Sequence, residues 1–366
     1  MRTLITAFLL FLFTLSTLPL LAQNEESTTI GGYGELHYNE PDGQARGTLD
    51  LHRFVLFVGH SFSPKLSFES EVEIEHTKIE GGTGGEVAVE QAYLDWHFST
   101  TVGLRAGILL PPIGIINQTH EPPTFNGVER PSVETAVIPS TWRESGAGIY
   151  GSLGEGVRYQ LYVMAGLLAE GFNGSDGIRE GRQEAAESSP ANPSFTGRLE
   201  YAPTTDLRLG GSFFAGNSTG GDAALGSGMV TLFSGDVRFT PGRFSFRAVG
   251  AAASIGDADK INLVYGNNVA DRISGWYAEG AYNVMPSFCD ETETALFPFV
   301  RYERYNTQAA VTGFTADPAN DRDEVTVGAT LKPTYNTAFK IDYQFFHNAA
   351  GTTAKQLNLG IGYQFN

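Results

Sequence analysis

Apolar and polar side chains alternate along most of the chain after residue 26. The last segment is the cleanest example, with Leu357, Leu359, Ile361, Tyr363 and Phe365 on one face and polar residues or glycine on the other. Because successive side chains of a β-strand point to opposite faces, a period of two predicts strands with one apolar face. Helical spacing is hard to find. The same alternation is found at 66–74, 157–163, 276–284, 325–331 and 339–345.

The connections between these segments alternate between short turns and long polar loops. The short links are 63–64, 99–101, 153–156, 203–205, 240–242 and 333–336. The long links are 39–47, 78–85, 111–143, 170–192, 217–227, 256–271, 308–322 and 348–354. Membrane barrels have short periplasmic turns and long external loops, so this pattern favours an all-β, antiparallel transmembrane β-barrel of about 16 strands over a soluble sandwich.

Aromatic residues on the apolar faces lie close to the short turns. An interfacial girdle of a membrane barrel belongs at this level, whereas a soluble sandwich would be more polar there. The segment 54–58 is apolar on both faces, so its register is open, and a subunit contact or a plugged wall would explain it. The girdle candidates are Phe62, Trp96, Phe98, Tyr201, Phe239, Tyr282 and Phe365.

The first 22 residues have the pattern of a secretory signal peptide. Arg2 precedes the apolar run 4–21, and the chain becomes polar directly after Ala22, where we expect cleavage. The alternative is a membrane anchor. No other stretch approaches the roughly 18 consecutive apolar residues of a spanning helix. Residues 23–366 are therefore expected to form the exported barrel and to cross the membrane with strands.

Composition narrows the function classes. A net charge of −17 argues against a nucleic-acid partner, and the single Cys289 excludes a disulfide framework or a thiolate metal site. The seven histidines show no metal-ligand spacing, and no Ser/His/acid set can be assembled. The run 81–85 lacks the Lys-Ser/Thr of a phosphate loop. Acidic residues at 257–259 and 321–324 are expected to be solvated loop groups rather than a Ca²⁺ site. We therefore expect no enzyme, no cofactor and no metal.

Charged residues on the strands fall on the polar, lumen-facing side. Charges of both signs would set a transverse field across a water-filled pore, although any polar barrel interior also needs such side chains for solvation and cross-strand pairing. One strand carries four carboxylates on the same face. The candidate lumen residues are Glu69, Glu71, Glu73, Glu75, Asp95, Arg105, Arg158, Arg198, Arg301 and Glu303, with Arg53, Arg208 and Arg247 as further opposing basic groups.

The longest link, 111–143, is apolar and rich in proline at both ends, unlike a solvated surface loop. Long loops without a secondary-structure pattern are usually functional. We expect this link to fold into the barrel and narrow the pore, with Glu121, Glu129, Arg130 and Arg143 as candidate constriction residues. The alternative is a surface loop at a subunit contact.

Several segments, taken in order, resemble the phosphate-selective porin O/P family of Gram-negative outer-membrane proteins. They are Val-Glu-Gln-Ala-Tyr-Leu-Asp-Trp at 89–96, Leu-Arg-Ala-Gly-Ile-Leu-Leu-Pro-Pro-Ile-Gly at 104–114, Glu-Arg-Pro at 129–131, Arg-Glu-Ser-Gly at 143–146, Phe-Val-Arg-Tyr-Glu at 299–303 and Lys-Pro at 332–333. The resemblance implies a 16-stranded barrel, a third loop folded into the pore, and usually a trimer. Two features depart from the family: only six lysines are present, and the terminal aromatic Phe365 is next to last.

These observations predict an outer-membrane porin for passive diffusion of small hydrophilic solutes and ions, with weak cation preference or little selectivity. The expected partners are outer-membrane lipid, two further copies in a homotrimer, and the barrel-assembly machinery, through the C-terminal strand. One alternative is a substrate-specific channel for phosphate, pyrophosphate, sugars or dicarboxylates. The other is a structural or adhesive surface barrel with a closed lumen.

Overall fold

A computed structural model describes residues 26–43, 46–77, 84–288 and 293–365. The predicted signal peptide 1–22, with its cleavage site, lies outside these residues, as do Cys289 and most of the 81–85 run. Within the described ranges, no helix has the length and apolar character needed to cross a membrane.

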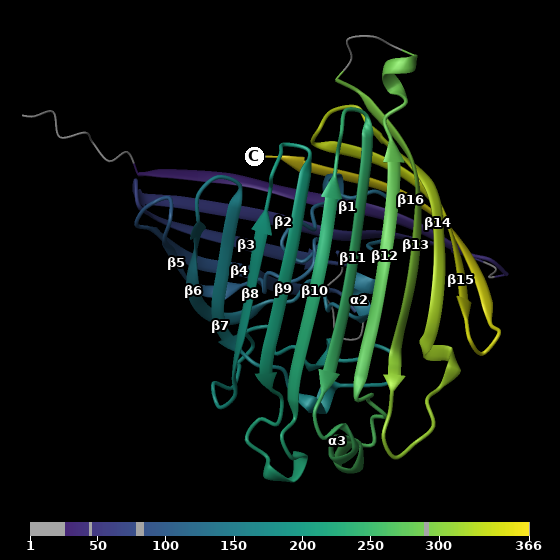
Figure 1. Cartoon of the computed structure of the whole chain (residues 1–366). Helices are drawn as coiled ribbons and strands as arrows, with labels where there is room; N and C mark the ends of the chain where they lie inside the picture. The colour runs from purple at the N-terminus through teal and green to yellow at the C-terminus, as the bar shows by residue number, and fades with distance from the viewer. Residues whose placement is uncertain (1–25, 44–45, 78–83, 289–292, 366) are drawn as a thin grey trace, which may run out of the picture.

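Sixteen antiparallel strands form one sheet that closes on itself, which confirms the predicted barrel (Figure 1). β1 pairs with β16, from Gly32 opposite Phe365 to Pro41 opposite Gln356. Closure leaves no unpaired sheet edge, as a lipid surrounding requires. The strands are β1 (Ser27–Pro41), β2 (Thr48–Ser63), β3 (Leu66–Glu75), β4 (Glu86–His97), β5 (Gly103–Leu109), β6 (Glu144–Ser152), β7 (Val157–Ala165), β8 (Pro193–Tyr201), β9 (Leu207–Asn217), β10 (Met229–Phe239), β11 (Phe244–Ile255), β12 (Arg272–Tyr282), β13 (Ala295–Ala310), β14 (Asp321–Lys332), β15 (Thr337–Asn348) and β16 (Thr353–Phe365).

Long and short connections lie at opposite ends of the barrel, as the sequence predicts. The helix α3 (Ala258–Tyr265) stands at the end that carries the long loops, at the bottom of Figure 1. The connection 283–294, between β12 and β13, is the exception, because it is long but belongs to the short-turn end. The remaining helices are α2 (Val133–Ala136), η1 (Pro122–Thr124), η2 (Ala169–Gly171), η3 (Arg179–Gly181), η4 (Ala223–Leu225), η5 (Met285–Ser287) and η6 (Pro318–Asn320).

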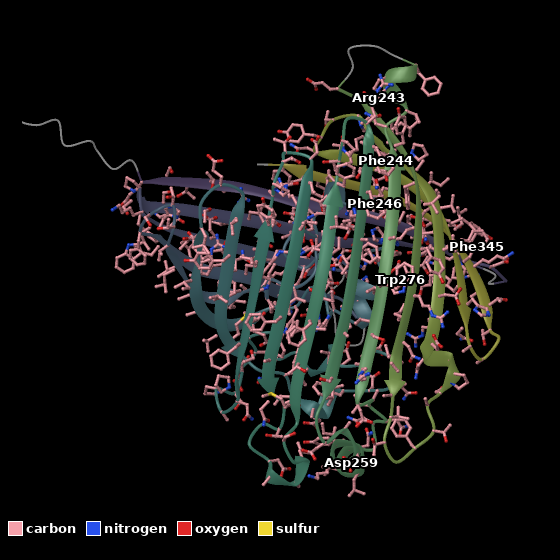
Figure 2. The ribbon with its side chains drawn as sticks, in the orientation of Figure 1. Arg243, Phe244, Phe246, Asp259, Trp276 and Phe345 are labelled. Atoms are coloured by element: carbon pink, nitrogen blue, oxygen red, sulfur yellow. The ribbon has the colours of Figure 1, made fainter. Side chains whose placement is uncertain are left out.

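Aromatic side chains cover the outer face near the short turns. All seven girdle candidates are exposed, from Phe239 at 38% to Trp96 at 49%. In Figure 2, Phe244 and Phe246 project at the same end, and Trp276 lies further along the wall. Large aromatic rings exposed in a ring around one end are favourable at a membrane–water interface, where one edge is apolar and the other is wet.

The segment that is apolar on both faces belongs to β2 and forms a filled part of the wall. Val55 points inward and is fully buried, and the Phe57 ring packs against Tyr33 of β1 with centroids 5.6 Å apart. Leu56 points outward and is exposed. This inward packing agrees with the plugged wall, one of the two explanations offered by the sequence.

Two loops of the chain itself pack inside part of the barrel. The inner faces of β9–β13 are apolar toward the loop end and pack against two inward-folded loops and α3. Trp142 from one loop packs against Phe214 of β9, with centroids 4.7 Å apart and an angle of 51° between the ring planes, and Phe172 from the other loop is buried in the same cluster. The inward-folded loops are 110–143, between β5 and β6, and 166–192, between β7 and β8.

Two sequence expectations are wrong at this level. The link 170–192 was expected to be an external polar loop, but Phe172 and Ile178 are buried inside the barrel. These apolar side chains are scattered among polar ones in the sequence, and they pack against the apolar interior. The acidic residues 321–324 were expected in a solvated loop. They belong to β14 instead, and Glu324 points inward and is 3% exposed.

Candidate functional site

The loop 110–143 holds its shape through buried polar contacts. One oxygen of Glu134 accepts hydrogen bonds from the backbone N–H groups of Ile115 (2.8 Å) and Ile116 (2.7 Å). The other oxygen accepts from the Tyr277 hydroxyl of β12 at 2.6 Å. Asn117 donates to the carbonyl of Trp142 at 3.1 Å, which joins the two ends of the loop. A buried carboxylate that is fully hydrogen-bonded fixes this loop on the wall.

The same loop is bonded to opposite walls of the barrel. Arg53 of β2 donates to the His120 carbonyl at 3.2 Å. Eight strands away around the closed sheet, the N–H of Gly114 donates to the Ser234 hydroxyl of β10 at 3.3 Å. Between these two walls, the N–H of Val133 donates to Glu303 of β13 (3.0 Å) and that of Val128 donates to Asp342 of β15 (2.6 Å). The loop therefore crosses the lumen instead of lying along one side of it.

Glycine on β16 permits the close approach of this loop to the wall. A Cβ placed on Gly362 would lie 2.3 Å from the Cβ of Pro122, and one on Gly360 would lie 3.1 Å from Val128. Any larger side chain at Gly362 would displace the loop. Part of the chain's high glycine content therefore has a direct packing role.

The second inward loop, 166–192, is stacked on the first. Arg179 donates to the carbonyls of Ser140 (2.9 Å) and Thr135 (3.3 Å). Arg182 donates to the carbonyls of Ser140 and Thr141, each at 3.1 Å. Guanidinium groups thus satisfy backbone carbonyls at the end of the first loop, and the two loops form one layer across the barrel.

The charged candidates on the wall are gathered into three clusters. In the first, Arg53 forms ion pairs with Glu35 (2.6 Å) and Glu73 (3.4 Å), all three almost fully buried. Beside it, His120 of the loop contacts Glu90 at 3.1 Å. Of the four-carboxylate ladder, Glu73 is the member that Arg53 neutralises, while Glu71 accepts a hydrogen bond from Gln91.

The second cluster lies under the loop on β12 and β13. Arg301 pairs with Glu303 at 2.8 Å and Glu279 at 3.5 Å, and it also donates to the Glu129 carbonyl at 3.3 Å. Arg247 of β11 contacts Glu279 at 3.3 Å. These predicted lumen residues are therefore joined to the loop rather than free in the pore.

The third cluster lies toward the short turns. Arg198 binds Asp236 through two nitrogens, at 2.6 and 2.9 Å, and Arg105 pairs with Asp95 at 2.8 Å. Arg158 is exposed and has no ion-pair partner among the described residues. The four loop candidates are placed differently from one another. Glu129 and Arg130 line a cavity, Glu121 precedes η1, and Arg143 pairs with Glu184 of the second inward loop at 2.8 Å.

Polar side chains line cavities beside the loop layer and on the strand wall. One of about 340 Å³ is lined by Glu35, His37, His52, Glu75, Glu129, Arg130 and Arg179 among others. A second, of about 350 Å³, contains the carboxylates Glu69 and Glu71 and no basic side chain. A third, of about 390 Å³ near the short turns, is lined by Arg105, Arg158, Arg198, Arg208 and Arg238, with Glu200. The first and second are acidic or mixed, and the third is basic.

Charge states in the first cavity follow from its contacts. Burial alone would raise the pKa of Glu129, but hydrogen bonds with His37 and Asn39 outweigh it and lower the pKa to about 2. Burial and the neighbouring Arg182 lower the pKa of Arg179 to about 10. Both groups therefore keep their charges at neutral pH, so the cavity holds fixed charges of opposite sign.

Sequence reasoning missed one group of residues. Asp50, His52 and His76 meet at the loop end of β2 and β3, although they are spread over 27 positions. We expected no metal site because the histidines lack the short sequence spacing of known metal-ligand motifs. Residues on paired strands can lie side by side however far apart they are in the sequence. The alternation around 50–52 could have placed Asp50 and His52, but His76 lies beyond the end of its strand.

Solved structures with this architecture are outer-membrane porins and channels. The chain aligns with Salmonella typhi OmpF in complex with daunomycin (TM-score 0.62, 13% identity, covering 94% of this chain and 99% of that one). It aligns equally with the outer-membrane channel DcaP of Acinetobacter baumannii (0.62, 11%, 94% and 99%) and with the anion-selective porin from Comamonas acidovorans (0.60, 12%, 93% and 100%). The fold is therefore that of a porin-like 16-stranded barrel.

Sequence comparison places the chain in a family. It is 39% identical over 335 residues to an uncharacterized protein of Aquifex aeolicus (strain VF5), and the alignment covers 88% of this chain and 76% of that protein. The chain belongs to the same family as that protein. It matches no family model.

Proposed function

We propose that the protein is an outer-membrane porin, a water-filled channel through which small hydrophilic solutes and ions diffuse passively. The observation that carries this proposal is the layer formed by loop 110–143, which crosses a closed barrel with polar cavities on its borders. The loop would narrow the path, and fixed charges of both signs around it would sort solutes by charge and orientation.

Weak cation preference follows from the second cavity. Glu69 and Glu71 line it without basic side chains. Fixed carboxylates raise the local concentration of cations in a narrow aqueous space. The net charge of −17 acts in the same direction.

A substrate-specific channel for anions is the second candidate, and the basic cavity near the short turns favours it. Arg105, Arg198 and Arg238 are paired with carboxylates there, but Arg158 and Arg208 are exposed without an ion-pair partner among the described residues. Unpaired guanidinium groups suit phosphate or dicarboxylate ligands. Membership of the phosphate-selective O/P family would fit this second candidate.

The remaining expectations belong to the same proposal. The protein would be exported with its signal peptide removed, be inserted through the barrel-assembly machinery by way of β16, and lie in outer-membrane lipid as a homotrimer. A barrel with its lumen closed by the loop layer, acting as a structural or adhesive surface protein, is the opposing case.

Liposome swelling with sugars of increasing size tests the proposal. A diffusion porin gives uptake that falls smoothly with solute size, and heat-unfolded protein serves as the control. Reversal potentials under a KCl gradient then separate the two candidates, because cation preference supports the general porin and strong anion preference supports the specific channel. Absence of swelling in correctly folded protein would establish the closed barrel.

A further inference from the structure

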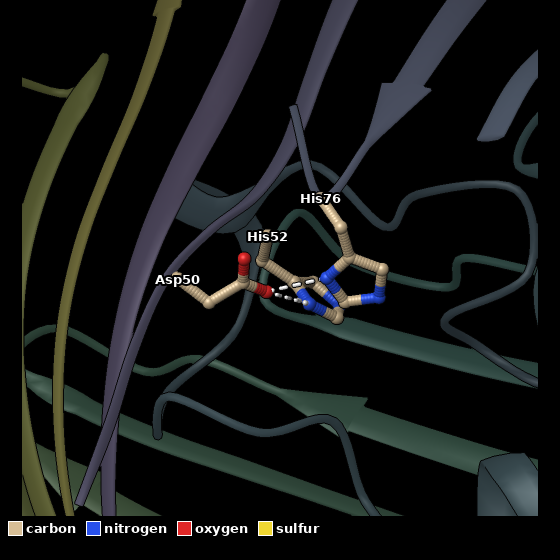
Figure 3. Close-up of side chains that lie close together, drawn as sticks. All are labelled: Asp50, His52 and His76. Carbon is tan, nitrogen blue, oxygen red and sulfur yellow. Dashed lines mark hydrogen bonds and ion pairs between the residues drawn. The ribbon is translucent and has the colours of Figure 1, made fainter. Parts of the chain in front are cut away.

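Asp50, His52 and His76 point toward one another at the edge of the lumen (Figure 3). The Asp50 Oδ2 atom lies 2.6 Å from Nδ1 of His76 and 3.6 Å from Nδ1 of His52. The two imidazole rings have centroids 5.5 Å apart. One ligand atom from each residue therefore falls within 4.8 Å of the others.

Backbone irregularities bring the three side chains together. Between β1 and β2 the register shifts, so that Glu35 pairs with Arg53 but Leu36 pairs with Leu51, and His52 is the extra, bulged residue. A β-bulge re-aims a side chain that regular pleating would send to the other face. His76 has a left-handed φ of 50° directly after β3, and its N–H donates to the His52 carbonyl at 3.2 Å.

His37 positions His52 without competing for the same ligand. The two rings are stacked, with centroids 4.7 Å apart and an angle of 11° between their planes. Both nitrogens of His37 are already engaged, Nε2 with Glu35 at 3.2 Å and Nδ1 with Glu129 at 3.3 Å. The stack limits rotation of His52 and leaves its Nδ1 facing Asp50.

The cluster is open to solvent. The side chains of Asp50, His52 and His76 are 24%, 34% and 42% exposed. His52 also lines the 340 Å³ cavity beside the loop layer. An ion could therefore enter from the aqueous side and keep water in its remaining coordination positions.

We propose that Asp50, His52 and His76 form a binding site for a divalent transition-metal ion of the Zn²⁺ type on the lumen wall. Two imidazoles and one carboxylate are a common ligand set for zinc, with metal–ligand distances of about 2.0–2.2 Å and water completing the shell. The ion would lie between Asp50 Oδ2 and the Nδ1 atoms of His76 and His52, which are 2.6 and 3.6 Å from that oxygen. The hydrogen bond between His76 and Asp50 would then be replaced by one bond from each residue to the metal. Binding at this site does not depend on whether the lumen conducts.

The donor set selects against other ions and distinguishes this cluster from a second one. Ca²⁺ and Mg²⁺ prefer oxygen ligands, whereas two of the three residues in this group offer nitrogen. Glu71, Glu90 and His120 also lie close together, but His120 is buried and held by Glu90 and the Asn117 carbonyl. Both ring nitrogens of His120 are thus engaged, and that group fixes the loop to the wall.

Calorimetric titration of the tag-free, folded barrel in detergent with ZnCl₂ tests the site. We expect one Zn²⁺ per chain and, with Co²⁺, the visible absorption of a nitrogen- and oxygen-ligated ion. His52→Ala and His76→Asn should each weaken Zn²⁺ binding by about 10- to 100-fold. Asparagine is chosen at 76 because it tolerates the left-handed backbone there.

The matched control is His347→Asn. His347 forms a similar exposed contact with Asp323, with Nδ1 2.9 Å from Oδ1, but it belongs to no group of three potential ligands among the described residues. Its substitution should leave Zn²⁺ affinity unchanged. Wild-type affinity retained in the folded His52→Ala/His76→Asn double variant, confirmed by heat-modifiable gel mobility, would overturn the proposal. Competition by millimolar Mg²⁺ would overturn the assigned metal class.

Discussion

Arg198, on β8, shows how one charged side chain joins the wall to the loop layer. Its guanidinium binds both oxygens of Asp236 on β10 and also donates to the Gly114 carbonyl of the inward loop at 3.1 Å. The Asp236 side chain is fully buried. A paired, hydrogen-bonded charge is tolerated in such a place. Without Arg198, the buried carboxylate would keep only the more distant Arg238, whose Nε lies 3.8 Å from Oδ1.

We therefore expect Arg198→Gln to lower the free energy of unfolding by about 3 kcal/mol, because Asp236 would lose its bidentate partner. Tryptophan fluorescence during urea unfolding in lipid vesicles measures this change. Adding Asp236→Asn should restore part of the loss.

The control for that prediction is Arg304→Gln. Arg304 is 54% exposed and contacts Asp321 at 3.2 Å, so its loss should cost less than about 1 kcal/mol. Equal destabilisation by the two arginine substitutions would contradict the role given to burial.

At the scale of elements, the decisive one is the loop 110–143. Apolar residues hold it against β9–β13, and polar groups fasten it to β2, β12, β13 and β15. The second inward loop is stacked against it through Arg179 and Arg182. An element bonded at so many places is a rigid part of the barrel, in contrast to a mobile surface loop.

Replacing residues 121–131 with a short Gly-Ser linker should raise single-channel conductance by about twofold or more, because the replaced segment lies across the aqueous path. Planar-bilayer recording measures the change. An unchanged conductance would contradict the assignment of this loop as the constriction of the pore.

Two further variants accompany that experiment. Shortening the external connection 311–320 is the matched control and should leave conductance unchanged. Arg179→Ala/Arg182→Ala, which removes the contacts between the two inward loops and no pore-crossing residue of 121–131, should give a smaller rise with more current noise.

At the scale of the whole molecule, charges of opposite sign occupy different cavities. The cavity beside Glu129 and Arg130 is mixed, the cavity on the β1–β4 wall is acidic, and the cavity that extends from the loop layer to the short turns is basic. A solute crossing the barrel is exposed to all of these fields. Net selectivity is a difference between them, which is why we expect it to be weak.

Cation preference should fall as salt concentration rises. The Debye length shortens from about 10 Å at 0.1 M salt to about 3 Å at 1 M, so fixed carboxylates act over less of the pore. Reversal potentials measured at a constant tenfold KCl gradient, centred first at low and then at high concentration, test this. A preference independent of salt would point to tight ion binding at one site instead.

The fold could be predicted closely from the sequence, and the candidate site only in part. Period-two alternation and the two classes of connection gave sixteen strands, and the aromatic residues gave the girdle, because each depends on local order along one strand. The inward course of 111–143 followed from its apolar and proline-rich ends. The inward course of 166–192 was missed, since its buried Phe172 and Ile178 are separated by polar residues.

Pairing across the lumen is what the sequence left open. Alternation assigns Arg53, Glu73 and Arg301 to the inner face. It does not predict that Arg53 forms ion pairs with Glu35 and Glu73, or that Arg301 donates a hydrogen bond to the loop. Those partners depend on register, a bulge and the path of a loop. The meeting of Asp50, His52 and His76 has the same origin. The sequence by itself determined the barrel, its two classes of connection and its polar lining. Only the tertiary structure decided which charges are neutralised and which remain free, because strand register and loop packing set the distances on which electrostatic interactions depend.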